Sequence, residues 1–186
     1  MRIAKKVDDM TQAFNGGDKN SFLVGQTPVR QWQNVAIGSL GLWLSGSLLL
    51  DFVIMPTLWT TGMMESSGFA SASYSIFWIF NRVELLCAAA ALSSMWALSE
   101  VSRADLETKR EMIASAVMLL LIALSYTFVL TPYMSGLGIN LDVLATTKSL
   151  PAEMTQLHAI YWVLEASKLA IAGLLLSKCG NRAIAR

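Results

Sequence analysis

The chain has 186 residues, of which 54% are hydrophobic and only 15% are charged. Soluble domains contain nearer to a quarter charged residues, so this composition and a mean hydropathy of +0.51 indicate a membrane protein. The net charge of +1 excludes the strongly basic surface typical of nucleic-acid-binding proteins, and no nucleic-acid partner is expected.

The first 31 residues are polar and mixed in charge, and they contain no apolar core of a signal peptide. We interpret them as a cytoplasmic tail. A membrane domain over residues 32–178 follows, and residues 179–186 form a short basic tail. A transmembrane helix needs about 20 mostly apolar residues, and four segments satisfy this. The sequence therefore predicts an all-α, four-helix transmembrane bundle of two helical hairpins, with spans over residues 32–58, 73–98, 112–133 and 154–177.

The distribution of Lys and Arg predicts the orientation of these spans. Eleven of these residues lie in the two tails and in the loop between the second and third spans, whereas the two opposite loops contain only Lys148. Basic residues favour the cytoplasmic side. We therefore expect both termini in the cytoplasm, in a multi-pass protein of a bacterial inner or internal membrane.

The first and third spans share a pattern near their non-cytoplasmic ends. "FVIMP" ends at Pro56 and "FVLTP" ends at Pro132, and both prolines are predicted to end their helices. The second and fourth spans each place a glutamate after an Ile-aromatic pair, in "IFNRVE" and "IYWVLE". These matches indicate a parallel duplication of a helix hairpin, although prolines at helix ends are common enough to arise independently.

Ionisable residues interrupt three of the four apolar spans. Because a charge in hydrocarbon is costly, these residues are expected to face the bundle interior and to form one polar cluster. The pairs we expect are Asp51 with Arg82, which lie at similar depths, and Glu165 with Lys168, which are three residues apart. Glu84 would then contact His158, Lys168 or a water-lined cavity. The predicted cluster comprises Asp51, Arg82, Glu84, His158, Glu165 and Lys168.

Small residues at spacings of three and four suggest close helix packing on two spans. They are Gly38, Gly41 and Ser45 on the first span, and Ala166, Ala170 and Gly173 on the fourth. Neither the two cysteines, Cys87 and Cys179, nor the lone histidine has a spacing typical of a disulfide framework, a metal site or a haem site. No cofactor or metal is expected, and no set of catalytic residues points to an enzyme.

Two functional readings of the cluster remain open. In the first, the protein binds or passes a small solute, an ion or a proton through the buried polar site. In the second, it is an accessory or assembly subunit of a larger membrane complex, and the polar groups serve helix packing only. Besides the lipid bilayer, the expected partner is a second copy of the chain or a larger membrane complex; the sequence does not identify a small-molecule ligand.

Two segments resemble a known family. "LWLSGSLLLDFVIMPTLW" and "TQLHAIYWVLEASKLAIAGLL" are similar to the first and last helices of the four-helix membrane proteins typified by transmembrane protein 205. The resemblance covers about residues 33–177. It implies an α-helical membrane bundle, transfers no catalytic residue, and draws attention to Asp51, Pro56 and His158. The "NRVELLCAAA" segment and the polar tail depart from the family pattern, which suggests a subfamily with its own partner.

Overall fold

The computed structural model describes residues 29–63, 66, 68–101, 105–144 and 152–184, and it has four long helices. The first runs over residues 29–60 as an α-helix, a π-helical turn η1 (Leu50–Ile54) and α2 (Met55–Thr60). The second is α3 (Phe69–Val101). The third comprises α4 (Leu106–Ser125), the π-helical turn η3 (Tyr126–Leu130) and α5 (Thr131–Leu144), and the fourth is α6 (Ala152–Ile184).

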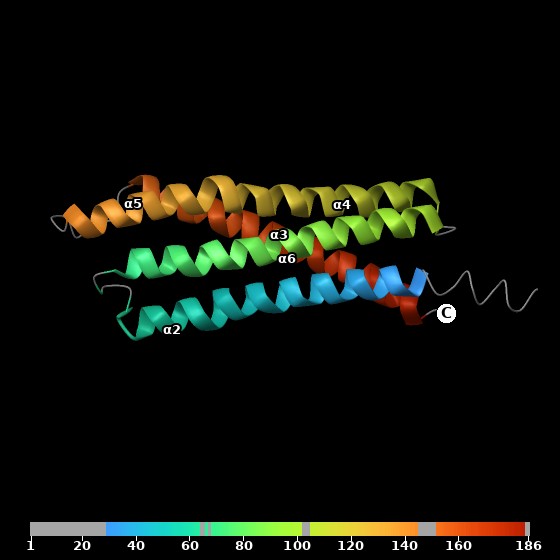
Figure 1. Ribbon diagram of the computed structural model, residues 1–186, viewed down its shortest axis with the longest axis horizontal. Helices are drawn as coiled ribbons and strands as arrows, with labels where there is room; N and C mark the ends of the chain where they lie inside the picture. The colour runs from blue at the N-terminus through green and yellow to red at the C-terminus, as the bar shows by residue number, and fades with distance from the viewer. Residues whose placement is uncertain (1–28, 64–65, 67, 102–104, 145–151, 185–186) are drawn as a thin grey trace, which may run out of the picture.

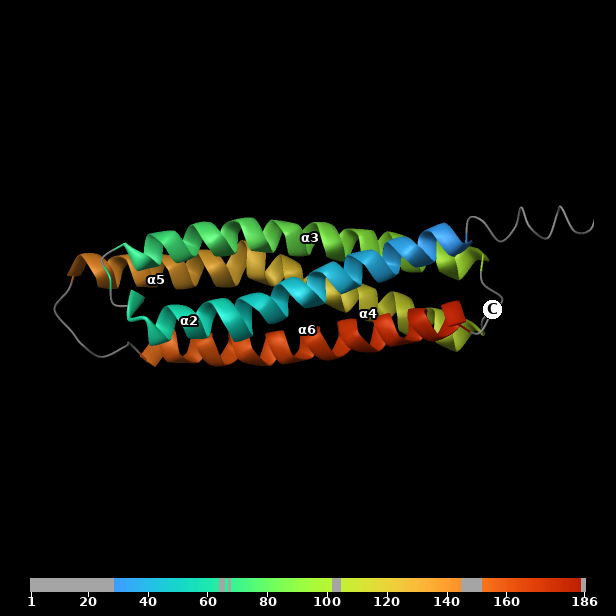
Figure 2. The same ribbon diagram turned by 90° about the horizontal axis from the view of Figure 1, so that it is seen from below.

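The four helices form one antiparallel bundle, as predicted (Figure 1). α3 packs against α4 and α5, these pack against α6, and the first helix lies between α6 and α3 (Figure 2). The start of the first helix and the end of α6 lie at the same end of the bundle as the end of α3 and the start of α4, and we call this the terminal end. The opposite end contains α2, the start of α3, the end of α5 and the start of α6.

All four helices are long and apolar enough to cross a membrane, consistent with an integral multi-pass protein. Each is longer than the span predicted for it, because hydropathy marks only the segment that matches hydrocarbon. The first helix already begins at Val29, inside the predicted tail, while residues 1–28 and Lys148 lie outside the described residues.

On each helix the buried residues recur at alternating spacings of three and four residues. Such spacing is typical of helices that pack nearly parallel around a shared core, with side chains inserted between those of the neighbouring helices. On the first helix the buried positions are Gln33, Ala36, Leu40, Trp43, Ser47 and Leu50, and on α6 they are Glu165, Lys168, Ala172, Leu175 and Cys179. The bundle core is therefore apolar toward the terminal end, polar around Glu84, Glu165 and Lys168, and apolar again around Leu130 and Leu157 nearer the opposite end.

The predicted small-residue contacts are wrong. A Cβ added at Gly38, Gly41 or Gly173 would meet no atom within 4 Å, and Ser45 and the two alanines of α6 are exposed. They lie outside the three-four pattern of buried positions, so their small size does not bring helices together. The close approach occurs at Gly46 instead, where an added Cβ would lie 3.2 Å from the Phe80 ring of α3.

Neither proline ends its helix, contrary to the prediction. The first helix continues to Thr60 beyond Pro56, and α5 continues to Leu144 beyond Pro132. A π-helical turn precedes each proline, and the residue just before the proline donates its N–H five residues back, Met55 to Leu50 and Thr131 to Tyr126. The wider turn accommodates a ring that would clash in a regular α-helix. The same device at matching positions in both hairpins fits the predicted duplication.

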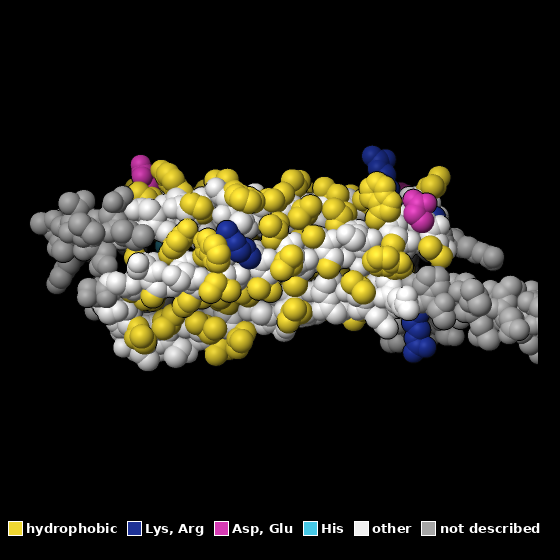
Figure 3. Space-filling model, viewed as in Figure 1, with side chains coloured by type: hydrophobic (Ala, Val, Ile, Leu, Met, Phe, Trp, Pro, Cys, Tyr) yellow, Lys and Arg dark blue, Asp and Glu magenta, His cyan; other side chains and the backbone are white. Residues whose placement is uncertain are grey.

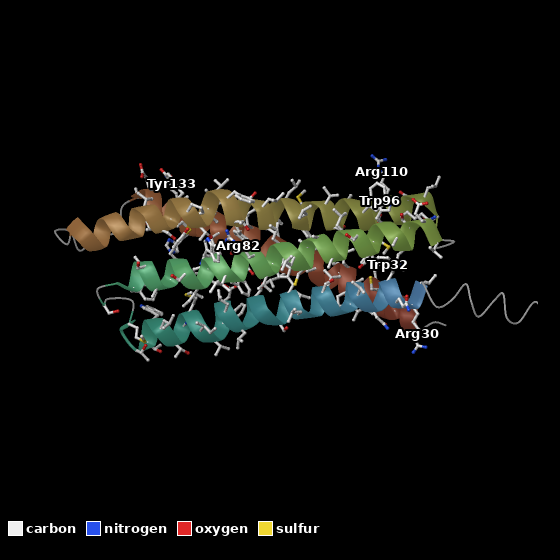
Figure 4. The ribbon with its side chains drawn as sticks, in the orientation of Figure 1. Arg30, Trp32, Arg82, Trp96, Arg110 and Tyr133 are labelled. Atoms are coloured by element: carbon white, nitrogen blue, oxygen red, sulfur yellow. The ribbon has the colours of Figure 1, made fainter. Side chains whose placement is uncertain are left out.

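The outer surface is mostly apolar along its length (Figure 3). Exposed Trp32 and Trp96 lie near Arg30 and Arg110 at the terminal end, and exposed Tyr133 lies toward the opposite end (Figure 4). Aromatic side chains favour the two membrane–water interfaces, so this arrangement is typical of a bundle that spans a bilayer.

Candidate functional site

Four charged side chains are buried together in the polar part of the core. They are Asp51 of η1, Glu84 of α3, and Glu165 and Lys168 of α6, and none is more than 5% exposed. We call these four residues the central cluster. Lys168 lies between two carboxylates, with Nζ 2.5 Å from Glu84 Oε1 and 2.7 Å from Glu165 Oε2. The predicted pair of Glu165 with Lys168 and the predicted contact of Glu84 with Lys168 are both confirmed.

Glu84 has all its described partners on one carboxylate oxygen. Besides Lys168, its Oε1 accepts hydrogen bonds from Trp43 Nε1 at 2.8 Å and from Ser47 Oγ at 3.2 Å. Trp43 and Ser47 are four residues apart on the first helix, so both point to the same place. A buried carboxylate with a cation and two neutral donors is well stabilised as an anion.

Glu165 and Asp51 have a different environment. Tyr126, the first residue of η3, donates its hydroxyl to Glu165 Oε2 at 3.1 Å, and Tyr161 donates to Asp51 Oδ1 at 2.7 Å. Asp51 and Glu165 also interact electrostatically, and the rings of Tyr126 and Tyr161, which bind them, have centroids 5.4 Å apart. Each carboxyl group has one oxygen, Asp51 Oδ2 and Glu165 Oε1, with no hydrogen-bond partner among the described residues.

The charges of the central cluster do not balance. Three carboxyl groups share the buried polar part of the core with a single ammonium group, which contacts two of them, and no other basic side chain among the described residues is buried. Two carboxylates that share one site cannot both stay ionised at low cost, so such pairs hold a proton between them.

The indole of Trp43 offers a first test of the Glu84 environment. Trp43→Phe removes one hydrogen bond to a buried carboxylate, so we expect a loss of about 1–3 kcal/mol in the free energy of unfolding. Reversible unfolding in detergent measures it. Trp96→Phe is the matched control, because Trp96 is 60% exposed, and it should change stability by no more than about 0.5 kcal/mol. Equal losses in the two variants would show that the bond to Glu84 contributes little.

Arg82 does not belong to the cluster, and its predicted pair with Asp51 is wrong. Its side chain is exposed on the outer face of α3, where Cζ lies 3.4 Å from the centroid of the Trp78 ring (Figure 4). Because successive helix residues are about 100° apart, Arg82 and Glu84 face opposite sides, and Glu84 is the one that faces inward. Tyr161 takes the place expected for Arg82 beside Asp51.

His158 also lies outside the cluster, contrary to the prediction. It is exposed near the start of α6, and its Nδ1 lies 2.8 Å from the backbone oxygen of Met154 on the same helix. Leu157 takes the inward position at this level and packs with Tyr126 and Leu130. His158 and Glu165 are seven residues apart, which predicted a shared helix face. At this level of the bundle, however, Leu157 and not His158 packs into the core.

The aromatic and hydroxyl groups of the site are absent from the sequence-based prediction. Trp43, Ser47, Tyr126 and Tyr161 bind the carboxylates, and Asn81 donates to Thr131 at 2.7 Å, one turn from Glu84 toward the opposite end. The three-four pattern is the signal that could have identified them, since Trp43, Ser47 and Tyr126 all continue it on their helices.

No protein-family model matches the chain, and no curated protein and no solved structure matches it either.

Proposed function

We propose that this multi-pass membrane protein binds protons reversibly at its central cluster and exchanges them with the side of the membrane that faces the opposite end. The observation that supports this most directly is the charge imbalance, with three buried carboxyl groups and one buried ammonium group. Binding one proton would halve this imbalance.

A proton suits the site better than a larger solute. The polar groups contact one another directly, at 2.5–3.3 Å, across all four helices. Asp51 and Glu165 interact electrostatically and each has one oxygen without a partner among the described residues, so the pair can hold one proton between two oxygens.

Tyr126 and Tyr161 supply the groups through which a proton would move. A phenolic hydroxyl both donates and accepts, so it can pass a proton between neighbouring oxygens. Asp51 and Tyr126 each lie in a π-helical turn, a feature that often marks functional sites because its hydrogen bonds rearrange easily. The two turns would let the site alternate between a proton-loaded and an empty arrangement.

The direction of exchange follows from the core on either side of the cluster. Toward the terminal end the core contains mainly apolar side chains, including Leu40, Ala91, Met95, Leu119 and Leu175. Toward the opposite end, polar Asn81, Thr131 and Tyr161 lie beside apolar Leu130 and Leu157. In this arrangement the cluster is separated from the terminal end by an apolar barrier. By the positive-inside rule that end is cytoplasmic, so protons would enter from the non-cytoplasmic side.

Proton exchange is tested by reconstituting the full chain in vesicles and placing a membrane-impermeant pH-sensitive dye on the side that faces the opposite end of the bundle. A pH step on that side should be buffered by proton binding more in wild-type vesicles than in vesicles with Glu165→Gln, which keeps the shape of the side chain but cannot take up a proton. Equal signals in wild-type, variant and protein-free vesicles would contradict the proposal.

The second candidate is an accessory subunit of a larger membrane complex, in which the cluster only joins helices. The observation that favours it is that Glu84 Oε1 already has three partners. The charge of Glu84 is therefore stabilised without a bound proton or ion. Under this alternative, Glu84→Gln should lower the abundance of the folded protein and release its partner in a pulldown from native membranes. Under proton exchange, Glu84→Gln should keep its partner, and the loss of exchange activity should appear in Glu165→Gln instead.

A further inference from the structure

Arg82 is a charged side chain on the apolar outer surface of α3. Figure 4 labels it on α3, and in the same view the space-filling surface shows a basic side chain surrounded by hydrophobic ones (Figure 3). Its exposed neighbours on α3 are Trp78, Ile79, Val83 and Leu86. Contact between a guanidinium group and hydrocarbon is costly in free energy unless an anion pairs with the group, so we expect an anion to bind at Arg82.

The guanidinium is already oriented by Trp78, one helical turn earlier. Cζ lies over the indole ring, and Nη1 donates to the backbone oxygen of Trp78 at 3.3 Å. Stacking on an aromatic face fixes the plane of a guanidinium and leaves its edge available for further hydrogen bonds. The remaining N–H groups of Arg82 are therefore held ready for an anion with two oxygens.

No carboxylate in the described part of the chain pairs with Arg82. The exposed acidic residues lie elsewhere: Glu100, Asp105, Glu107 and Glu111 around the α3–α4 connection, and Glu153 in the first turn of α6. A second copy of the chain packed side by side would present the same side chains at the same levels. It would therefore offer no described carboxylate at the level of Arg82.

The depth of Arg82 places it close to a membrane boundary. Exposed Trp78 and Trp96 are five turns apart on α3, roughly 27 Å at a rise of ~1.5 Å per residue. This matches the ~30 Å hydrocarbon core, so the two indoles mark its two boundaries. Helix side chains tilt toward the helix N-terminus, which for α3 is the opposite end, and the long Arg82 side chain thereby reaches the Trp78 boundary.

We propose that Arg82 and Trp78 form a binding site for the phosphate group of an anionic phospholipid at the boundary nearer the opposite end. The phosphate supplies the missing negative charge and two oxygens for the guanidinium edge, and the lipid chains cover the apolar side chains that flank it. The inference is independent of proton exchange, since Arg82 lies outside the central cluster.

The test compares the full chain in nanodiscs of phosphatidylcholine alone with nanodiscs that also contain phosphatidylglycerol. Thermal unfolding and native mass spectrometry report stabilisation and retained lipid. We expect phosphatidylglycerol to stabilise the wild type, and Arg82→Gln to weaken its retention by about tenfold or more. Arg110→Gln, at the other boundary, is the matched control and should retain the lipid. Arg82→Lys, which keeps the charge, should recover part of the retention.

Three outcomes would overturn the inference. The first is that Arg82→Gln retains phosphatidylglycerol as well as the wild type does. The second is that inorganic phosphate in lipid-free detergent stabilises the wild type equally, which would identify a soluble anion as the ligand. The third is that a cysteine placed at Ile79 cross-links to a second protein in vesicles, which would show that a protein covers this face.

Discussion

Lys168→Met is expected to lower the free energy of unfolding by about 3–5 kcal/mol, a larger stability effect than that of any other substitution proposed for this chain. Lys168 is 2% exposed and pairs with both Glu84 and Glu165. Its removal leaves three carboxyl groups in the core with no cation. Methionine has a similar length and fills much of the same space, so the loss reports charge more than volume. Reversible unfolding in detergent, or the yield of folded protein, measures it.

The chain contains its own control for this substitution. Lys178 also pairs with a glutamate, Glu111, at 2.9 Å, but this pair is largely exposed at the terminal end. Lys178→Met should therefore change stability by no more than about 1 kcal/mol. The double variant Lys168→Met with Glu84→Gln should be more stable than Lys168→Met alone, because it removes one of the carboxylates left without a cation. If Lys168→Met and Lys178→Met had equal effects, the buried pairs would not stabilise the bundle.

Asp51→Asn is expected to have opposite effects on stability and on function. The asparagine oxygen can still accept from Tyr161, and its amide N–H can donate to Glu165 Oε1, which has no partner among the described residues of the wild type. Stability at neutral pH should stay unchanged or rise by up to about 1 kcal/mol. Proton exchange in vesicles should fall by about tenfold or more, because the amide occupies the place of the shared proton and cannot release it.

The pH dependence of stability provides a second readout for Asp51→Asn. If the folded wild type holds a proton that the unfolded chain releases, its stability falls as the pH rises through that range. The variant binds no proton there, so its stability should fall less. Tyr161→Phe serves as the comparison, since it removes the donor to Asp51 but keeps both carboxyl groups; it should lose stability and keep its pH dependence. A normal exchange rate in Asp51→Asn would contradict the assignment.

The fold could be predicted from the sequence because hydrocarbon permits few alternatives. Runs of about 20 apolar residues predict helices, and the four long apolar helices of the bundle are confirmed. The burial of Glu84, Glu165 and Lys168 could also be predicted. A carboxyl group on a short side chain cannot reach water from the middle of a span, and a spacing of three residues places Glu165 beside Lys168.

The predicted positions of Arg82 and His158 are wrong because neither side chain has to be buried in the bundle in order to avoid hydrocarbon. Arg82 has a long apolar stem and lies one turn from an interfacial tryptophan, so it can face outward and still reach the membrane boundary. His158 lies close to the start of α6, where an exposed polar group need not meet hydrocarbon. Whether a charged side chain is buried depends on its depth in the membrane and on its length. The depth can be estimated from the number of residues that separate it from the interfacial tryptophans Trp78 and Trp96.

The π-helical turns and the tyrosine contacts could not be predicted from spacing alone. A proline in an apolar span is compatible with a helix end, a kink or a widened turn, and tertiary packing selects among these. Tyr126 and Tyr161 resemble interfacial aromatics in sequence. Only the phase of the three-four pattern distinguishes a tyrosine that faces the core from one that faces lipid, and Tyr133 on α5 is an exposed example.

Infrared spectroscopy of the reconstituted full chain tests the central claim most directly, since the carbonyl stretch of a protonated carboxyl group is separate from that of a carboxylate. We predict a protonated-carboxyl band at neutral pH that disappears reversibly as the pH is raised, and that is absent from both Asp51→Asn and Glu165→Gln but present in Glu84→Gln. A wild-type spectrum with no such band, or a band that persists in both Asp51→Asn and Glu165→Gln, would contradict the claim that Asp51 and Glu165 hold a proton between them.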